Sequence, residues 1–357
     1  ESFSEIVNAG VFAQEQVGYT DFVFLTVGAR YDANSAFGSE FSGVLYPKAA
    51  VSFIPSDAPF WNGPVGPLSS LRFRAALGQS GLQPGAFDAL TTYQALNSVS
   101  GAGVGPNNLG NPNLEPEIST EWEVGTELGL LDDRVALEGT YWNRTVSDAL
   151  VNRQFAPSGG FRSPQIVNIG ELKGQGVELA VRGLVLNQEN ISIDVFANTS
   201  YLWERVTDLG GAPPIKVGGS YPRYRNYLVE GFAPGTHFGV QLRDTPEGTL
   251  PVDLNGDGQP DTEEFLFGYL DGLTTEQALE DGLPSDPSTV LIAQNVDGEG
   301  NVLSPTGSAT DFFLGKPTPD WQGAFGVDIG FLQNFELSTL FEYKAGNFYI
   351  NNLTDAF

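Results

Sequence analysis

Residues 120–144, TEWEVGTELGLLDDRVALEGTYWNR, carry the clearest structural pattern of the chain. In its first half Trp122, Val124 and Leu128 alternate with acidic residues, and the second half alternates in the same way. Successive side chains of a β-strand point to opposite faces, so each half predicts a strand with one apolar and one charged face. Between them, the polar tetrapeptide 131–134 predicts a tight turn. The stretch therefore predicts an antiparallel hairpin.

The same alternation recurs in long runs at 22–31, 177–185, 191–201 and 335–344. These runs are about ten residues long, against ~5–6 for an ordinary globular strand, and they match the ~9–11 residues with which a tilted strand crosses a bilayer. A soluble β-sandwich is the alternative, since its outer face is also polar. The strand lengths favour a transmembrane barrel, as do the aromatic residues near the strand ends: Trp142, Tyr201, Trp203 and Tyr343.

The connections between these runs are alternately short and long. Short polar turns are predicted at 131–134, 187–190 and 333–334, and long Gly/Pro/Asn-rich stretches lie at 78–117, 156–165 and 206–322. Outer-membrane barrels have short periplasmic turns and long outer loops. We therefore predict an all-β, antiparallel transmembrane barrel segment over residues 1–357, with about 12–14 strands of a larger barrel and a mainly extracellular loop region at 206–322. Because the strands on both sides of 206–322 have their ends outside, this region must hold either no crossing or an even number, and the apolar pieces at 226–232 and 236–242 could supply two.

Composition excludes several functions. The chain has 44 acidic and 17 basic residues and a net charge of −27, so nucleic acid is not expected as a partner, because phosphate binding needs a basic surface. It has no cysteine and a single histidine, His237, which excludes thiolate zinc sites and multi-histidine metal sites. No catalytic Ser-His-Asp arrangement is evident around His237, and no enzyme activity is predicted. Methionine is absent too, so residue 1 is not expected to be a translation start.

One acidic segment has the spacing of a calcium loop. The stretch 253–264, DLNGDGQPDTEE, fits the pattern D-x-[DN]-x-[DN]-G-x5-E. Calcium takes six to eight hard oxygen ligands, and this spacing brings such oxygens together. Pro260 and the lack of flanking amphipathic helices argue against an EF-hand, and a solvated acidic turn is the alternative. We expect a structural calcium site whose ligands are Asp253, Asn255, Asp257, Gln259 (through its backbone carbonyl), Asp261 and Glu264.

Two other groups of residues are candidate binding groups. Aromatic side chains in the long loops stack on sugar rings in some proteins and pin loops together in others, and Tyr221, Tyr224 and Tyr227 are the candidates for ligand contact. Charges on the predicted wall should face the lumen, because facing lipid would cost about 2–4 kcal/mol for a basic residue and somewhat less for an acidic one. They would line a substrate path or, as the alternative, only form the wet face that any barrel has. The predicted lumen-facing residues are Glu121, Glu123, Glu127, Glu138, Arg144, Glu178, Arg182 and Asp194.

Several segments resemble TonB-dependent receptors of the SusC/RagA-like branch. They occur in the family's order across about 70–345, which is more specific than any single motif. Gly174 stands where the family more often has asparagine. The segments are LRFRAALGQSG (71–81), NPNLEPE (111–117) followed by Ser119, Glu121 and Glu123, GELKGQGVE (170–178), DLNGDG (253–258) and LGKPTPDW (314–321).

The resemblance implies an active importer in the outer membrane. Such receptors hold an N-terminal plug inside a barrel of about 22 strands, draw energy from TonB, pair with a SusD-like surface lipoprotein and import oligosaccharides or peptides. No plug, TonB box or closing strands are evident in this sequence. A structural or adhesive surface protein derived from a barrel fragment therefore remains the alternative, and a barrel enzyme is disfavoured by the single histidine.

Overall fold

The computed structural model describes residues 5–38, 43–98, 101–156, 158, 160–161, 163–217, 225–239, 295, 297, 300–308, 311–332, 334–346 and 348. The chain divides into two compact units, each described here by itself. The first contains residues 1–215, 230–234 and 318–348, and the second contains 216–229, 235–317 and 349–357. Within the described residues, no helix has the length and apolar character needed to cross a bilayer.

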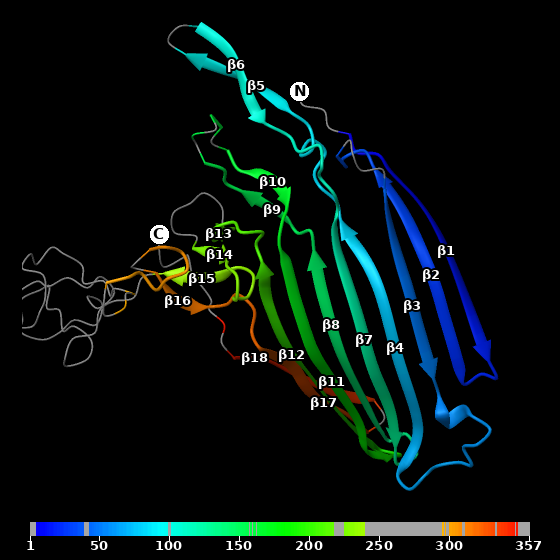
Figure 1. The fold of residues 1–357 in the computed structure, drawn as a ribbon. Coiled ribbons are helices and arrows are strands. Elements are labelled where there is room, and N and C mark those ends of the chain that lie inside the picture. Colours follow the sequence, from blue (N-terminus) through cyan, green and yellow to red (C-terminus); the bar gives the residue numbers. More distant parts are fainter. Residues whose placement is uncertain are drawn as a thin grey trace, which may run out of the picture. The chain divides into compact units, whose positions relative to one another are not determined.

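The first unit is built on one ten-stranded antiparallel sheet, here called the wall (Figure 1). Its strands lie side by side in chain order, and each strand between β1 and β18 pairs with the wall strand before it and the one after it. Most are 10 to 18 residues long, because the alternating runs of sequence continue without a break. The strands are β1 (Asn8–Tyr19), β2 (Val23–Asn34), β3 (Val44–Phe53), β4 (Leu68–Leu82), β7 (Glu117–Leu130), β8 (Val135–Ser147), β11 (Glu171–Gln188), β12 (Ile191–Asp208), β17 (Trp321–Phe331) and β18 (Phe335–Ala345).

Shorter strands form three small sheets. A hairpin joins β5 (Thr92–Ser98) to β6 (Gly101–Asn108), and another joins β9 (Leu150–Arg153) to β10 (Gln165–Asn168). The four-stranded sheet contains β13 (Ile215–Lys216), β14 (Asn226–Leu228), β15 (Thr236–Gly239) and β16 (Phe312–Gly315). A 3-10 turn, η1 (Pro55–Asp57), follows β3.

The described wall has fewer strands than expected from the sequence because two apolar pieces are not crossings. The pieces at 226–232 and 236–242 contribute β14 and β15 to the four-stranded sheet instead. These strands have three and four residues, well short of the ~9–11 that a crossing needs. The described part of 206–322 therefore adds no strand to the wall between β12 and β17.

The shortest connections lie at one end of the wall. The three predicted turns are confirmed, since they join β7 to β8, β11 to β12 and β17 to β18. A fourth short turn at 20–22, which the sequence interpretation missed, joins β1 to β2. Leu131, Asp132 and Asp133 all have positive φ, of 58° to 59°, which lets the chain reverse within a few residues. Figure 1 shows these turns at the lower end of the strands, together with the longer connection 54–67 that contains η1. The other long connections between wall strands lie at the upper end.

Many large apolar side chains of the wall are exposed. Phe335, Leu337 and Phe341, on one face of β18, are 52 to 58% exposed, and similar residues occur along β1, β2 and β17. The few fully buried apolar side chains, such as Leu114 and Val206, lie outside the middle of the wall. A soluble sheet would cover such a face with a second layer, so this wall is suited to contact with lipid.

Candidate functional site

Strand register divides the wall's side chains between two faces, because directly paired residues point to the same side. One row of partners runs Leu128, Leu137, Val181, Ala197, Phe325 and Phe341 across six strands. The adjacent row runs Arg72, Glu127, Glu138, Ala180, Asn198, Ala324 and Glu342. We call the face that carries the first row, with Leu128, the apolar face. We call the face that carries the second row, with Glu127, the polar face.

All eight residues predicted to face the lumen lie on the polar face. Glu121 pairs with Arg144, and Glu127 pairs with Glu138. Asp194 pairs with Leu184, which lies on the same face of β11 as Arg182, two residues away. Glu123 lies opposite Trp142, and Glu178 lies opposite Thr140. The alternation in the sequence was therefore sufficient to group them. That this face lines a lumen remains a prediction.

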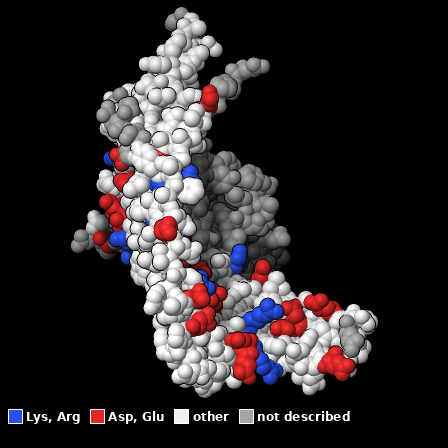
Figure 2. All heavy atoms as spheres, turned by 90° about the vertical axis from the view of Figure 1, so that its right-hand side faces the viewer, with Lys and Arg blue, Asp and Glu red and all other residues white. Residues whose placement is uncertain are grey.

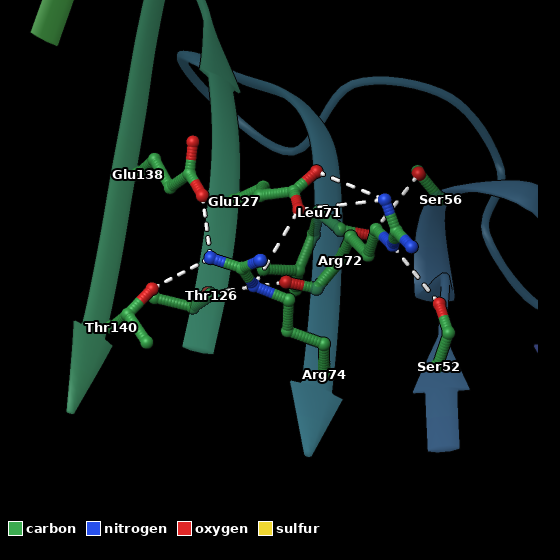
Figure 3. Close-up of polar contacts among 9 residues, drawn as sticks. All are labelled: Ser52, Ser56, Leu71, Arg72, Arg74, Thr126, Glu127, Glu138 and Thr140. Atoms are coloured by element: carbon green, nitrogen blue, oxygen red, sulfur yellow. Dashed lines mark hydrogen bonds and ion pairs between the residues drawn. The ribbon is translucent and has the colours of Figure 1, made fainter. Parts of the chain in front are cut away.

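Four charged side chains form a network at the centre of the polar face (Figure 3). Arg72 Nη1 lies 3.3 Å from Glu127 Oε2, and Arg74 Nε lies 3.8 Å from Glu127 Oε1. Arg74 also reaches across β7, where its Nη2 donates to Glu138 Oε1 at 2.5 Å and to Thr140 Oγ1 at 2.6 Å. Arg72 Nε donates to Ser52 Oγ at 2.9 Å. The network ties β3, β4, β7 and β8 together.

Arg74 has a specific task in this network. Glu127 and Glu138 are direct partners on neighbouring strands, and like charges in that position destabilise a sheet. The guanidinium of Arg74 contacts both carboxylates and offsets their repulsion. Arg72 and Arg74 were not among the residues predicted to face the lumen. Their alternation in 71–81 places them on one face, but only the register between β4 and β7 shows their partners.

The network gives a testable prediction. Replacement Arg74→Met should lower the free energy of unfolding by about 1–2 kcal/mol, since both groups are partly exposed and their interaction is partly screened. The measurement is urea unfolding of the protein in lipid vesicles.

Replacement Glu127→Gln in the Arg74→Met background should recover much of that loss, because it removes the uncompensated carboxylate pair. Arg144→Met is the matched control. Arg144 lies 3.9 Å from Glu121 and both side chains are about 45% exposed, so a smaller loss is expected. Equal losses at Arg74 and Arg144 would contradict a special role for Arg74.

The remaining polar face carries both charges and neutral hydrogen-bonding groups. One hollow is lined by Arg72, Glu127, Glu138 and Arg182, and a second includes Glu178, Ser200, Glu342 and Lys344. Figure 2 shows acidic and basic side chains intermixed in the lower part of the view. Such a surface can hydrogen-bond polar solutes without strongly binding an ion of one sign.

The apolar face has the height of a bilayer. On β12 and β17 an aromatic pair, Tyr201 and Trp321, lies at the loop end with ring centroids 4.9 Å apart. Phe331 and Phe335 stack at the turn end, with centroids 5.4 Å apart. Ten residues along β17 separate Trp321 of the first aromatic pair from Phe331 of the second. At ~3.3 Å per residue and ~40° tilt, this corresponds to roughly 25 Å along the membrane normal. This equals the usual height of the lipid-facing band of an outer-membrane barrel.

Most predicted ligand-contact and calcium residues cannot be placed. Tyr221, Tyr224 and the calcium loop 253–264 lie outside the described residues. Tyr227 is in β14, is partly buried, and packs edge-on against Phe238 with centroids 6.0 Å apart. This contact fits the alternative in which such a residue pins a loop. Burial lowers the pKa of His237, on β15, so its imidazole is neutral at neutral pH.

The calcium loop stays a prediction with a direct test. We expect calcium to protect residues 244–322 from limited proteolysis and chelation to expose them, because carboxylates held together without a cation repel one another. The matched variant is Asp257→Ala, which should show the chelated cleavage pattern even with calcium present. Cleavage that is the same with calcium and with chelator would overturn the prediction.

Comparison with known proteins agrees with this architecture. The family model described as TonB dependent receptor-like, beta-barrel matches residues 2–355. TonB-dependent receptor P3 of Formosa agariphila is 24% identical over 96% of this chain and 32% of its own length. TonB-dependent receptor SusC of Bacteroides thetaiotaomicron is 25% identical over 70% of this chain and 28% of its own length.

Solved structures share the fold. The RagAB peptide transporter aligns with a TM-score of 0.70 and 21% identity over 96% of this chain and 34% of its own. The "open-open" state of the RagAB peptide importer aligns with a TM-score of 0.72 over 97% and 33%. The chain thus spans about a third of the length of the proteins it matches. It is an outer-membrane protein of the TonB-dependent receptor-like β-barrel family, whose members are receptors and transporters rather than enzymes.

Proposed function

We propose that this chain forms part of the wall of an active importer that brings oligosaccharides, peptides or similar polar nutrients across the outer membrane. The observation that carries the proposal is the division of the wall into an apolar face and a polar face. Side chains of both charges and neutral donors and acceptors, such as Asn198 and Gln322, are kept away from lipid on the polar face. That arrangement suits a path for large polar solutes.

The proposed partners follow from the relatives. One relative is named SusC, and the solved neighbours are described as a peptide transporter and a peptide importer. We propose that the whole protein is energised by TonB and works with a SusD-like surface lipoprotein over the long loops. Under this proposal the short turns face the periplasm, and the region 206–322 faces the cell exterior.

Uptake by the native bacterium tests the proposal. Deleting the gene should abolish growth on one class of oligosaccharide or peptide as sole nutrient, and the full-length gene should restore it. Dissipating the proton gradient should stop uptake at unchanged receptor level, because TonB requires that gradient. Growth on all such nutrients that is unaffected by deletion would contradict import, and would favour a structural or adhesive surface protein.

A further inference from the structure

Two basic residues of the wall stand on the wrong face for a charge. Among the described residues of the ten wall strands, all other lysines and arginines lie on the polar face, including Lys48 and Lys344. Lys173 of β11 and Arg205 of β12 instead lie on the apolar face. Each is four residues from an apolar-face residue of its own strand, Val177 on β11 and Tyr201 on β12. Both side chains are exposed.

These two cations are direct neighbours. Lys173 and Arg205 are register partners, so their Cβ atoms lie about 4.5–5.5 Å apart. Like charges in that position repel and destabilise a sheet unless an anion lies between or above them. Lys173 Nζ has one carboxylate partner, Glu171 Oε1 at 2.8 Å, on its own strand. Within the described part of the chain, Arg205 has no acidic partner and lies over the Trp203 ring, 5.2 Å from its centroid.

Their height on the wall is that of lipid headgroups. Arg205 is four residues beyond Tyr201, the aromatic residue that marks the loop-end edge of the apolar band. Four residues correspond to roughly 10 Å along the membrane normal. The neighbouring side chains on this face become polar at the same height, since Thr145 pairs with Lys173 and Asn143 pairs with Gln175. An aromatic belt followed by polar and basic groups is the pattern of a bilayer interface.

We propose that Lys173 and Arg205 bind the phosphate of an anionic lipid headgroup, in the leaflet on the side of the long loops. The pair faces sideways from the wall, where lipid and not solute is the neighbour. A phosphate accepts hydrogen bonds from an ammonium and a guanidinium together, and it neutralises their mutual repulsion. Trp203 then contacts the glycerol or sugar region of the same lipid. This site does not depend on the import activity proposed above.

Native mass spectrometry of the full-length protein tests the site. The probes are phosphatidylglycerol and phosphatidylcholine with identical acyl chains, added to protein in a neutral detergent. The wild type should retain more phosphatidylglycerol. The double variant Lys173→Gln/Arg205→Gln should lose about tenfold or more of that preference, since each basic residue near a membrane surface contributes about fivefold.

Two further variants make the result specific. Arg182→Gln removes the same charge from β11 but on the polar face, so its lipid preference should match the wild type. The exchange Lys173→Arg/Arg205→Lys should keep the preference, which shows that a loss in the Gln variant is not a folding defect. An unchanged preference in the Lys173→Gln/Arg205→Gln variant would overturn the proposal. Displacement of phosphatidylglycerol by an equal concentration of inorganic phosphate would overturn it too, by showing a site for free anions.

Discussion

Replacement Val181→Arg should prevent most of the protein from assembling stably in the membrane. Val181 lies near the middle of the apolar band, between Leu137 and Ala197 on the neighbouring strands. An arginine facing lipid at that depth costs about 2–4 kcal/mol, which is a large fraction of the stability of a typical folded protein. The measurement is the fraction that migrates as folded protein on an unheated gel, together with the urea midpoint in vesicles.

The matched control is Ala180→Arg, one residue earlier on the same strand. Ala180 lies on the polar face opposite Glu138 and Asn198, so the new guanidinium meets water and a carboxylate. We expect a change smaller than about 1 kcal/mol there. Equal damage from the two variants would contradict the assignment of faces, and with it the grouping of the eight charged residues that we predicted to line the lumen.

Replacement Asp311→Ala should have the second largest effect, within the second compact unit. The Asp311 side chain is 1% exposed and forms an ion pair with Arg225. It also accepts a hydrogen bond from Thr306 Oγ1 at 2.8 Å, and its backbone carbonyl accepts one from Asn295 at 2.8 Å. Removing one partner of a buried ion pair costs about 3–5 kcal/mol. The 32% exposure of Arg225 reduces the expected loss to about 2 kcal/mol, because that guanidinium can regain water.

The loss should be local, so it needs a local measurement. Amide hydrogen exchange of residues 225–229 and 235–239 should rise in Asp311→Ala, while exchange in the wall strands stays unchanged. Asp297→Ala is the control in the same unit. Asp297 accepts hydrogen bonds from the backbone and side chain of Asn301 in a turn, and a smaller effect is expected there. If Asp311→Ala changes exchange equally in the wall strands and around β14 and β15, the ion pair does not specifically stabilise the four-stranded sheet.

The wall was predictable because lipid and water impose a period of two on a strand. The alternation in 120–144 and 191–201 was enough to assign the faces of β7, β8 and β12, and short polar segments marked three of the four tight turns. The same logic left open whether 226–232 and 236–242 cross the membrane. Their apolar residues serve a small sheet in which strands of three and four residues suffice, and local hydrophobicity does not distinguish that use from a crossing.

The contacts across the polar face were not predictable, because they depend on register between strands far apart in sequence. Arg72 meets Glu127, which is 55 residues away, and Tyr201 packs on Trp321 from the far side of the long loop region. The lipid-facing cations were overlooked for a related reason. Lys173 and Arg205 each occupy an ordinary position near a strand end, and only the pairing of β11 with β12 brings them together.

The connections between neighbouring wall strands differ greatly in length, and we expect this difference to influence the order in which the wall assembles. Closing a chain segment costs entropy that grows with its length, and closing 209–320 costs roughly 3 kcal/mol more than closing the turn at 131–134. Neighbouring strands from β1 to β12 can therefore pair one after another in chain order. The β17–β18 hairpin forms by itself and reaches β12 last. We therefore expect the contact between β12 and β17 to form last.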